Sequence, residues 1–306
     1  MPRILTIAAA QSGPNPKSAS RREILDRLIV LLEQAAARGC HLVTFTECAL
    51  TAFFPHWWIE DPAELDSYFE RSLPNADTQP LFDAAARLKI GFCLGYAERS
   101  SDQGRVRYFN SSVLVDQNGQ IIGHYRKVHL PGHCERRPAN PFQNLEKRYF
   151  EPGDLGFRTF DAFGARIGLL ICNDRRWPES YRSLGLQGCE VVLLGYNTPR
   201  HTPEYPETDR LADFHHQLSL QAGAYQNGMW IVASAKAGLE EGVDQIGESM
   251  IVAPSGEVVI KSNTLCDELL VYRCDLDACK TYKEGVFPHR NRRVEHYGGL
   301  LRRVEG

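Results

Sequence analysis

The chain has 306 residues, 43% of them hydrophobic and 24% charged, which is the composition of an ordinary folded protein and excludes an intrinsically disordered chain. Its formal net charge of −3 at pH 7 provides no basic excess for binding nucleic acid or an anionic membrane. We therefore expect a small molecule as its partner, with no nucleic acid and no membrane.

The N-terminus and the cysteines bear on the compartment. Residues 1–5 (MPRIL) run straight into an apolar strand pattern, unlike a signal peptide, and no window reaches the roughly 18 apolar residues of a membrane span. The nine cysteines are odd in number and irregular in spacing, which fits reduced thiols better than a disulfide framework. We expect a cytoplasmic enzyme.

The pattern of the first part of the chain predicts a strand, a helix and a second strand. Residues 4–10 form a compact apolar run, and Ser20-x-x-Glu23 is a capping box before apolar residues at helical spacing. Residues 41–47 (HLVTFTE) predict a second strand with Glu47 at its carboxyl end, where open α/β sheets usually place their chemistry. That placement makes Glu47 a candidate base, and a surface glutamate at a strand end is the alternative interpretation of this segment alone.

Between residues 80 and 129 the pattern predicts one helix and three strands. The helix is 80–89 and the strands are 90–98, 107–116 and 120–129, the last two joined by Gln117-Asn118-Gly119, a strong hairpin signal. Lys127 lies on the outgoing strand, and alternation predicts that His129 shares its face.

A thiol between a buried strand and a helix is the sharpest feature. Residues 131–156 predict a functional loop, and residues 165–171 (ARIGLLI) predict a buried strand that ends at Cys172. Any single cysteine can be a small core residue. The following Asn173-Asp174-Arg175-Arg176, however, brings cations and a helix start close to the thiol, and both favour a reactive thiolate.

The remaining elements define the fold class. Strands are predicted at 191–197, 229–235, 249–253 and 258–261, and a helix at 214–226. This order combines α/β alternation with antiparallel hairpins, so we expect two mixed sheets packed face to face with helices outside. No repeat, low-complexity tract or linker interrupts the pattern, which predicts a single domain over 1–306.

Templates for bound cofactors are absent from the sequence. There is no phosphate-binding glycine loop, no dinucleotide fingerprint and no Gly-x-Ser-x-Gly elbow. No Cys and His cluster has the spacing of a zinc site. We expect a reaction that needs neither a cofactor nor a metal.

Three segments carry a resemblance to a known family. FTE around Glu47, YRKVHLP around Lys127 and ICNDRRWPE around Cys172 resemble the Glu-Lys-Cys arrangement of the nitrilase, or carbon–nitrogen hydrolase, superfamily. Longer strings such as TAFFPHW, FNSSVLVD and FHHQLSLQAGAYQNG are similar, within it, to the N-carbamoyl-D-amino-acid hydrolases. The resemblance implies a four-layer α-β-β-α sandwich and a homodimer or homotetramer, with residues from about 280 to 306 as an intersubunit tail.

The resemblance also implies roles. Glu47 would take the proton of Cys172, and the thiolate would attack the substrate carbon. Lys127, with a backbone N–H near Asn173, would stabilise the oxyanion. Glu146 matches an additional glutamate found beside the triad in the family. Positions that match substrate-binding residues are Asn173, Arg175, Arg176, Asn197 and Thr198, with His129 as a further candidate.

The function that this implies is hydrolysis of N-carbamoyl-D-amino acids to D-amino acid, ammonia and carbon dioxide. The Arg175-Arg176 pair favours a substrate with a carboxylate, whereas the D-configuration rests on the resemblance alone. Another amidase, a β-ureidopropionase or a nitrilase would use the same triad, and a non-catalytic relative is a further alternative. Thr46, Cys48 and Asn144 depart from the family pattern.

Overall fold

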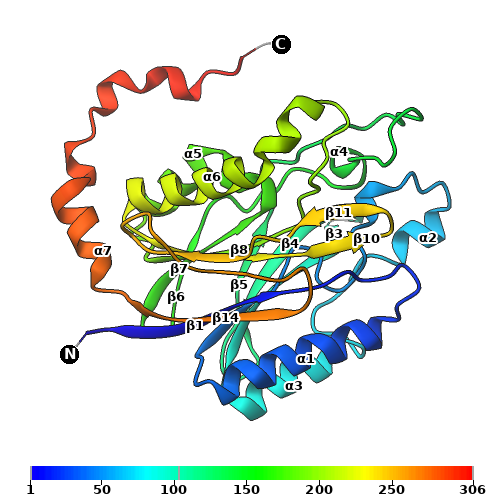
Figure 1. The fold of residues 1–306 in the computed structure, drawn as a ribbon, viewed down its shortest axis with the longest axis horizontal. Coiled ribbons are helices and arrows are strands. Elements are labelled where there is room, and N and C mark those ends of the chain that lie inside the picture. The colour runs from blue at the N-terminus through cyan, green and yellow to red at the C-terminus, as the bar shows by residue number, and fades with distance from the viewer. Residues whose placement is uncertain (1, 103, 305–306) are drawn as a thin grey trace.

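The computed structural model describes residues 2–102 and 104–304. Two six-stranded mixed sheets pack face to face, and helices cover the outer face of each (Figure 1). The helices are α1 (Arg21–Ala37) and α3 (Gln79–Leu88) on the first sheet, and α5 (Pro178–Leu186) and α6 (Ala212–Asn227) on the second. The predicted four-layer sandwich is confirmed.

The first sheet has the strand order β14-β1-β2-β3-β4-β5. The strands are β1 (Ile4–Gln11), β2 (Leu42–Thr44), β3 (Gly91–Asp102), β4 (Arg105–Val115), β5 (Ile121–Arg126) and β14 (Glu268–Asp275). Strands β1, β2 and β3 are parallel, while β3, β4 and β5 form an antiparallel meander. The predicted hairpin is present, and Gly119 in its turn has a φ of 74°. Sequence analysis missed β14, which pairs antiparallel with β1 along its whole length.

The second sheet has the order β13-β12-β9-β8-β7-β6. The strands are β6 (Thr159–Ala162), β7 (Ala165–Ile171), β8 (Val191–Tyr196), β9 (Trp230–Ala235), β12 (Met250–Val252) and β13 (Val258–Lys261). A separate hairpin joins β10 (Ala237–Glu240) to β11 (Val243–Ile246). Because β7 and β8 are parallel, the residues that follow them meet at one edge of the sheet. This register makes neighbours of Cys172 and Asn197.

The pattern of apolar residues explains why the sheets and helices pack in four layers. Every residue of β8 and β9 is buried, as expected for strands covered on both faces. Helix α1 turns a stripe of buried leucines and isoleucine toward the first sheet, and its predicted capping box between Ser20 and Glu23 is present. The apolar layers thus enclose a smaller set of buried polar groups, and two of these, Glu47 and Cys172, lie just after the ends of strands.

Two predicted strands are shorter than expected. Strand β2 stops at Thr44, so Glu47 lies in a turn beyond the strand and not at its last position. Strand β5 stops at Arg126, and the backbone N–H of His129 then donates to Asp174 at 3.0 Å instead of to a neighbouring strand. The expectation that Lys127 and His129 share one strand face is therefore wrong, because the alternation ends before them.

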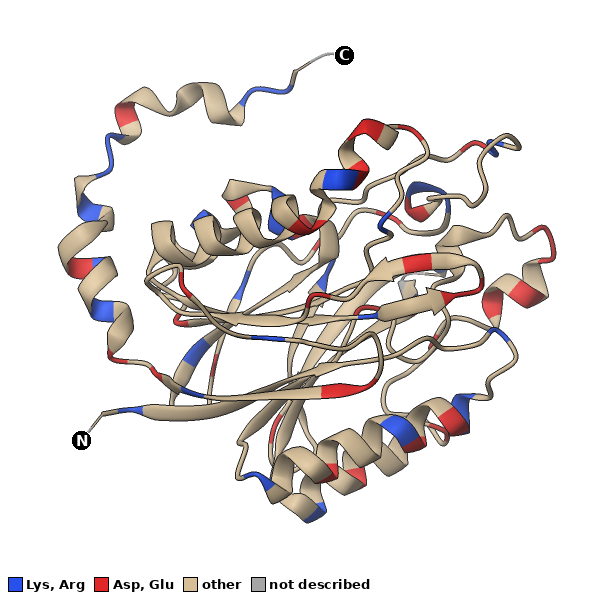
Figure 2. Cartoon of the chain, in the orientation of Figure 1, with Lys and Arg blue, Asp and Glu red and all other residues tan. Residues whose placement is uncertain are grey.

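The C-terminal segment leaves the body of the molecule. After α7 (Ala278–Lys280) a series of short turns runs past the end of α6 and away from the sheets (Figure 1). Figure 2 shows Lys and Arg recurring along this segment with acidic residues between them, and the helices of the body also carry both signs of charge. None of the helices within residues 2–102 and 104–304 has the length and apolar character needed to cross a bilayer.

Candidate active site

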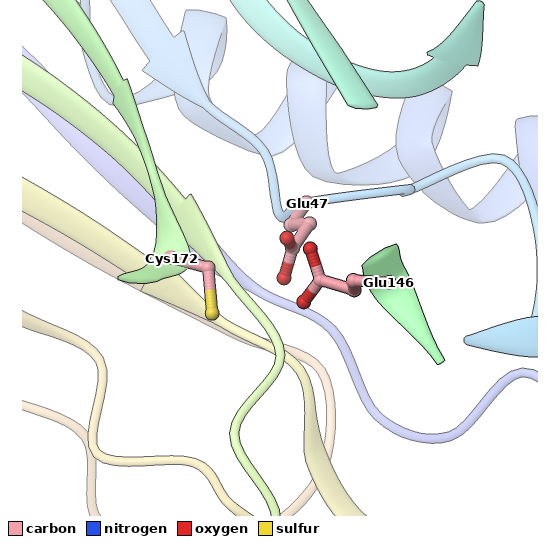
Figure 3. Close-up of side chains that lie close together, drawn as sticks. All are labelled: Glu47, Glu146 and Cys172. Carbon is pink, nitrogen blue, oxygen red and sulfur yellow. The ribbon is translucent and has the colours of Figure 1, made fainter. Parts of the chain in front are cut away.

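Four side chains from separate segments meet between the two sheets. Glu47 comes from the turn after β2, Lys127 follows β5 and Cys172 follows β7. Glu146 opens the short helix α4 (Glu146–Tyr149) in the predicted loop. The Lys127 Nζ lies 2.7 Å from Glu47 Oε1 and 2.6 Å from Glu146 Oε2. The sulfur of Cys172 faces both carboxylates, with oxygen and sulfur atoms of the three residues within 4.8 Å of one another (Figure 3).

The group is almost completely buried, which governs its charge state. Relative exposures are 0% for Glu47, 1% for Lys127, 2% for Glu146 and 5% for Cys172. Burial raises the pKa of Glu146 to about 7, although the Lys127 ammonium opposes the shift. Burial by itself would lower the pKa of Lys127, but its anionic neighbours raise it well above its usual value. The geometry therefore provides a fixed cation beside a carboxyl that can exchange a proton near neutral pH.

Two glycines let the segment bearing Glu47 pass between the sheets. A Cβ at Gly195 would lie 2.6 Å from the Glu47 backbone nitrogen, and one at Gly95 would lie 2.5 Å from the Thr46 carbonyl oxygen. Real Cβ contacts do not become this short, so both positions require glycine for close approach. The base is consequently held by backbone packing on two sides.

Cys172 stands at a sharp corner. Its φ is 44°, a left-handed conformation that is rare outside glycine, and a 3₁₀ turn (Cys172–Arg176) follows at once. The buried Asp174 closes this corner by accepting from Ile171 N at 3.1 Å and from the Tyr125 hydroxyl at 2.8 Å. Burial, and then the Glu47 charge, raise the pKa of the Cys172 thiol. Thiolate formation therefore depends on nearby cations.

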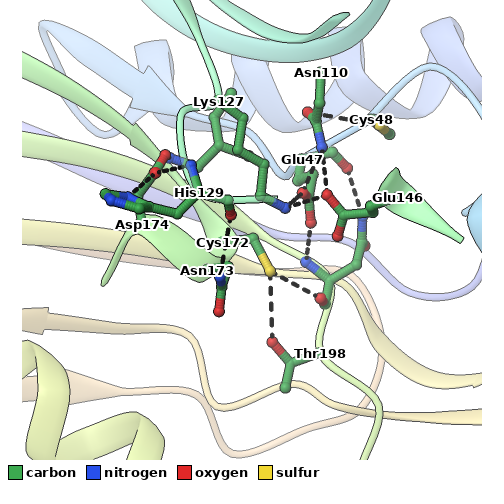
Figure 4. Close-up of polar contacts among 12 residues, drawn as sticks. Glu47, Cys48, Asn110, Lys127, His129, Glu146, Cys172, Asn173, Asp174 and Thr198 are labelled. Carbon is green, nitrogen blue, oxygen red and sulfur yellow. Dashed lines mark hydrogen bonds and ion pairs between the residues drawn. The ribbon is translucent and has the colours of Figure 1, made fainter. Parts of the chain in front are cut away.

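Two asparagines complete the network (Figure 4). Asn110 Nδ2 donates to Glu47 at 2.7 Å and to Glu146 at 3.4 Å, a role that the sequence pattern did not indicate although Asn110 lies in the FNSSVLVD segment. Asn197 connects base and nucleophile, because its backbone N–H donates to Glu47 Oε2 at 2.8 Å and its carbonyl accepts from Cys172 Sγ at 3.2 Å. The two oxygens of Glu47 are thus oriented by three donors.

A cavity of about 90 Å³ opens beside the sulfur. Its walls include Phe53, His56, Phe142 and Asn144, and the predicted site residues that line it are Glu146, Cys172, Asn173, Arg176, Asn197 and Thr198. The volume is small beside the several hundred Å³ of typical ligand pockets, which suits a small reacting group.

The adjacent arginines differ in their surroundings. Arg175 is buried, and its donors reach His216, Thr198 and Cys172 instead of the cavity. Arg176 is exposed and lines the cavity.

His129 also lies away from the cavity. Its ring Nδ1 donates to the Asp174 carboxylate, 2.9 Å away, and the ring stacks on Trp177 at a centroid distance of 4.8 Å. Of the predicted substrate-binding residues, Arg175 and His129 are therefore the two that the structure places outside the cavity lining.

Two of the residues that depart from the family pattern, Cys48 and Asn144, lie beside the site. Cys48 has a φ of 45°, and its thiol lies 3.9 Å from the Asn110 side-chain oxygen. The Asn144 carbonyl accepts from His133 N at 2.9 Å, which ties the loop over the cavity.

The cluster of Glu47, Glu146 and Cys172 contains atom types that bind metals, and it is the one such group among the described residues. The Lys127 ammonium, however, bridges both carboxylates and supplies the positive charge that an ion would bring. This donor set therefore fits an acid, base and nucleophile better than a metal site.

Comparisons with known proteins agree with this geometry. The model of the carbon-nitrogen hydrolase family matches residues 6–284. The N-carbamoylputrescine amidase of Solanum lycopersicum is 28% identical over 98% of this chain and 95% of its own, and the citrullinase of Francisella tularensis is 26% identical over 98% and 99%. A carbon-nitrogen hydrolase from Helicobacter pylori G27 superposes with a TM-score of 0.83 at 25% identity, covering 99% of this chain and 100% of that one. The chain belongs to the carbon–nitrogen hydrolase family.

Proposed function

We propose that the protein hydrolyses N-carbamoyl amino acids, with preference for the D-configuration, through a covalent intermediate on Cys172. One observation carries the proposal: the nucleophile and an arginine without a carboxylate partner line the same small cavity. In residues 2–102 and 104–304, no Asp or Glu oxygen lies within 4.0 Å of Arg176, while most other arginines of the body are paired. A substrate carboxylate would provide the missing partner through two parallel hydrogen bonds.

The other charged group at the cavity mouth is already neutralised. Glu204 accepts from Arg137 and from Asn140, both at 2.9 Å, and lies 3.3 Å from His133. The uncompensated charge at the cavity mouth is therefore positive. An anionic substrate is favoured there over a cationic one.

A buried acceptor is available for the nitrogen of the substrate. Asn197 is 3% exposed and lines the cavity, and its Oδ1 accepts no hydrogen bond from the described residues. An unsatisfied buried acceptor costs free energy, and an N–H of the bound carbamoyl group would remove that cost. The hydroxyl of Thr198 lies nearby, 3.9 Å from Cys172 Sγ.

The chemistry follows from these positions. Glu47 takes the thiol proton, and the thiolate of Cys172 forms a bond to the carbamoyl carbon while Lys127 stabilises the oxyanion. The carbon–nitrogen bond to the terminal amine breaks, and the amine takes the proton held by Glu47 and leaves as ammonia. Water, activated by Glu47 or by Glu146 with its pKa of about 7, then attacks the thiocarbamate carbon. The sulfur–carbon bond breaks, the thiol takes back a proton, and the released carbamate loses carbon dioxide.

The names of two relatives support a carbamoyl group as the part of the substrate that reacts. The Solanum amidase is named for N-carbamoylputrescine and the Francisella enzyme for citrulline, and both compounds are carbamoylated amines. The charge beside that group is what differs, because N-carbamoylputrescine carries an ammonium whereas an N-carbamoyl amino acid carries a carboxylate close to the reacting carbon. Arg176 favours the second.

The test is ammonia release from a matched substrate panel. It contains the D and L forms of one N-carbamoyl amino acid, its amine analogue without the carboxylate, N-carbamoylputrescine, citrulline and acetamide. We expect the D acid to have the highest kcat/KM. Arg176→Lys should reduce that value by roughly ten- to hundredfold, equivalent to about 1.5–3 kcal/mol, and should leave the amine analogue nearly unchanged.

Arg22→Lys on α1 is the control, since Arg22 is exposed and pairs with Asp26 far from the cavity. It should behave as wild type. Preference of the wild type for N-carbamoylputrescine, or an equal effect of Arg176→Lys on acid and amine, would refute carboxylate recognition at this position. Hydrolysis of acetamide alone would leave only the family's general amidase chemistry.

We also propose a homo-oligomer that uses the C-terminal segment. Leu300 and Leu301 in that segment are 65% and 90% exposed, and Leu218 on α6 is 49% exposed. An apolar groove of about 1030 Å³ lies between this segment, α5 and α6. Light scattering after size-exclusion chromatography tests the proposal, and a monomer at micromolar concentration would contradict it.

A further inference from the structure

Arg175 is a buried cation without an acidic partner. Its side chain belongs to the largest of those that are less than 2% exposed. In the described part of the chain no carboxylate oxygen comes within 4.0 Å of its guanidinium, which contacts Cys172, Thr198 and His216. Burying an unpaired charge is costly, so a group of opposite charge is expected within contact distance.

Only one of these contacts can become an anion in the reaction. Arg175 Nη1 lies 2.8 Å from the Cys172 carbonyl oxygen and 3.6 Å from Cys172 Sγ, and Nη2 donates to the Thr198 hydroxyl at 2.9 Å. The ring of Tyr196 lies 4.8 Å from the guanidinium carbon and remains uncharged. The thiol sulfur is the remaining candidate.

We propose that Arg175, held in place by His216, is the counter-ion of the Cys172 thiolate. This inference rests on the proposed nucleophilic role of Cys172, and it gives Arg175 a catalytic contact in place of substrate binding. When the Sγ–H bond breaks, the proton moves to a Glu47 oxygen and the electron pair stays on sulfur, which faces the guanidinium. No further reactant is required.

The charges around the sulfur explain why Lys127 alone does not suffice. In the resting site its ammonium is shared between Glu47 and Glu146, at 2.7 and 2.6 Å. Arg175 has no such competitor, so its full charge acts on the sulfur. The charged and titratable groups around the sulfur are Glu47, Lys127, Glu146, Arg175, Arg176 and Tyr196.

His216, from α6, is the positioning residue. Its Nδ1 accepts from Arg175 Nε at 3.0 Å, so that nitrogen carries no proton. Its Nε2 lies 3.2 Å from the Glu248 carbonyl oxygen, which accepts the ring proton. Burial lowers the pKa of His216 well below its usual value, which keeps the ring neutral and able to accept. The histidine thus orients the cation without repelling it.

Alkylation of the free enzyme tests the inference without any substrate. The rate at which iodoacetamide modifies Cys172 is measured by mass spectrometry from pH 5 to pH 10. In Arg175→Met we expect a ten- to thousandfold slower reaction at pH 7, recovered at high pH, because an opposite charge at this distance shifts a pKa by about one to three units. Arg175→Lys should recover part of the rate, and His216→Leu should shift the profile in the same direction by a smaller amount.

Arg38→Met is the matched control. Arg38 follows helix α1 on the other side of the sandwich, has no carboxylate oxygen within 4.0 Å among the described residues, and donates from Nη1 to the Leu269 carbonyl oxygen at 3.3 Å. Its profile should match wild type. Circular dichroism establishes folding, and if Arg175→Met does not fold, the profile of Arg175→Lys decides.

The outcomes separate the two proposals. An unchanged alkylation profile in a folded Arg175 variant would overturn the counter-ion role, and a higher KM for carboxylate substrates alone would reassign Arg175 to substrate binding. If Cys172 of the wild type shows no preferential alkylation, the nucleophile itself is misassigned and the proposed function fails.

Discussion

Replacing Gly195 by alanine should disable the base while leaving the fold in place. The added Cβ would lie 2.6 Å from the Glu47 nitrogen, whereas ordinary contacts begin at 3.4 Å, so the backbone must yield by 3.4 − 2.6 = 0.8 Å. Glu47 is the residue that moves, because strand β8 is fixed between β7 and β9. A displacement of about 1 Å at a reacting group costs roughly a hundredfold in rate, and overpacking costs about 1–3 kcal/mol of stability.

The assay compares kcat for the best carbamoyl substrate with the midpoint of urea unfolding. Gly285→Ala is the control, because a Cβ there meets no atom within 4 Å and the φ is not left-handed. We expect Gly195→Ala to remain folded with kcat reduced about a hundredfold, and Gly285→Ala to match wild type. Wild-type kcat in a folded Gly195→Ala protein would show that close packing on the Glu47 segment does not position the base.

Further predictions concern the nucleophile, metals and acid stability. Cys172→Ala should abolish turnover with an unchanged circular dichroism spectrum, and residual activity above contamination would refute the thiol mechanism. Prolonged EDTA or phenanthroline treatment should leave the rate unchanged, because Lys127 already neutralises the buried carboxylates; a loss restored by zinc would contradict this. Burial favours a higher pKa for Glu98, but hydrogen bonds from His124 and Arg126 lower it to about 2 from an ordinary value of 4.5. The stability it contributes is present above pH 4.5 and lost toward pH 2, so Glu98→Gln should lower the free energy of unfolding at pH 7 by about 3 kcal/mol and flatten its dependence between those pH values. An unchanged urea midpoint would contradict that linkage.

Local patterns predicted most of the fold. The capping box at Ser20, the Asn118-Gly119 turn and the buried run before Cys172 each depend on a few neighbouring residues, and each appears as expected. Strand β14 was missed because its pairing with β1 joins residues more than 250 positions apart, which no local pattern reports. The early ends of β2 and β5 have the same origin, since contacts across the sheets override the alternation.

The active site also contains residues that the sequence could predict and residues whose surroundings it could not. Motifs and the resemblance together singled out Glu47, Lys127, Cys172 and Glu146, and the structure brings these four side chains together. The different surroundings of Arg175 and of its neighbour could not be predicted, because adjacent residues in a 3₁₀ turn point in different directions that only the packing of α6 determines.

The position of the cluster between two sheets ties activity to their docking. Glu47 and Lys127 follow strands of the first sheet, whereas Cys172 and Asn197 follow strands of the second. Neither sheet by itself holds both Glu47 and Cys172, the proposed base and nucleophile. A partly unfolded enzyme in which the layers separate would therefore retain much of its secondary structure and yet lose all turnover, so in a denaturant titration the loss of activity should precede or accompany the circular dichroism transition and never follow it. Turnover can thus serve as a reporter of sheet separation during inactivation.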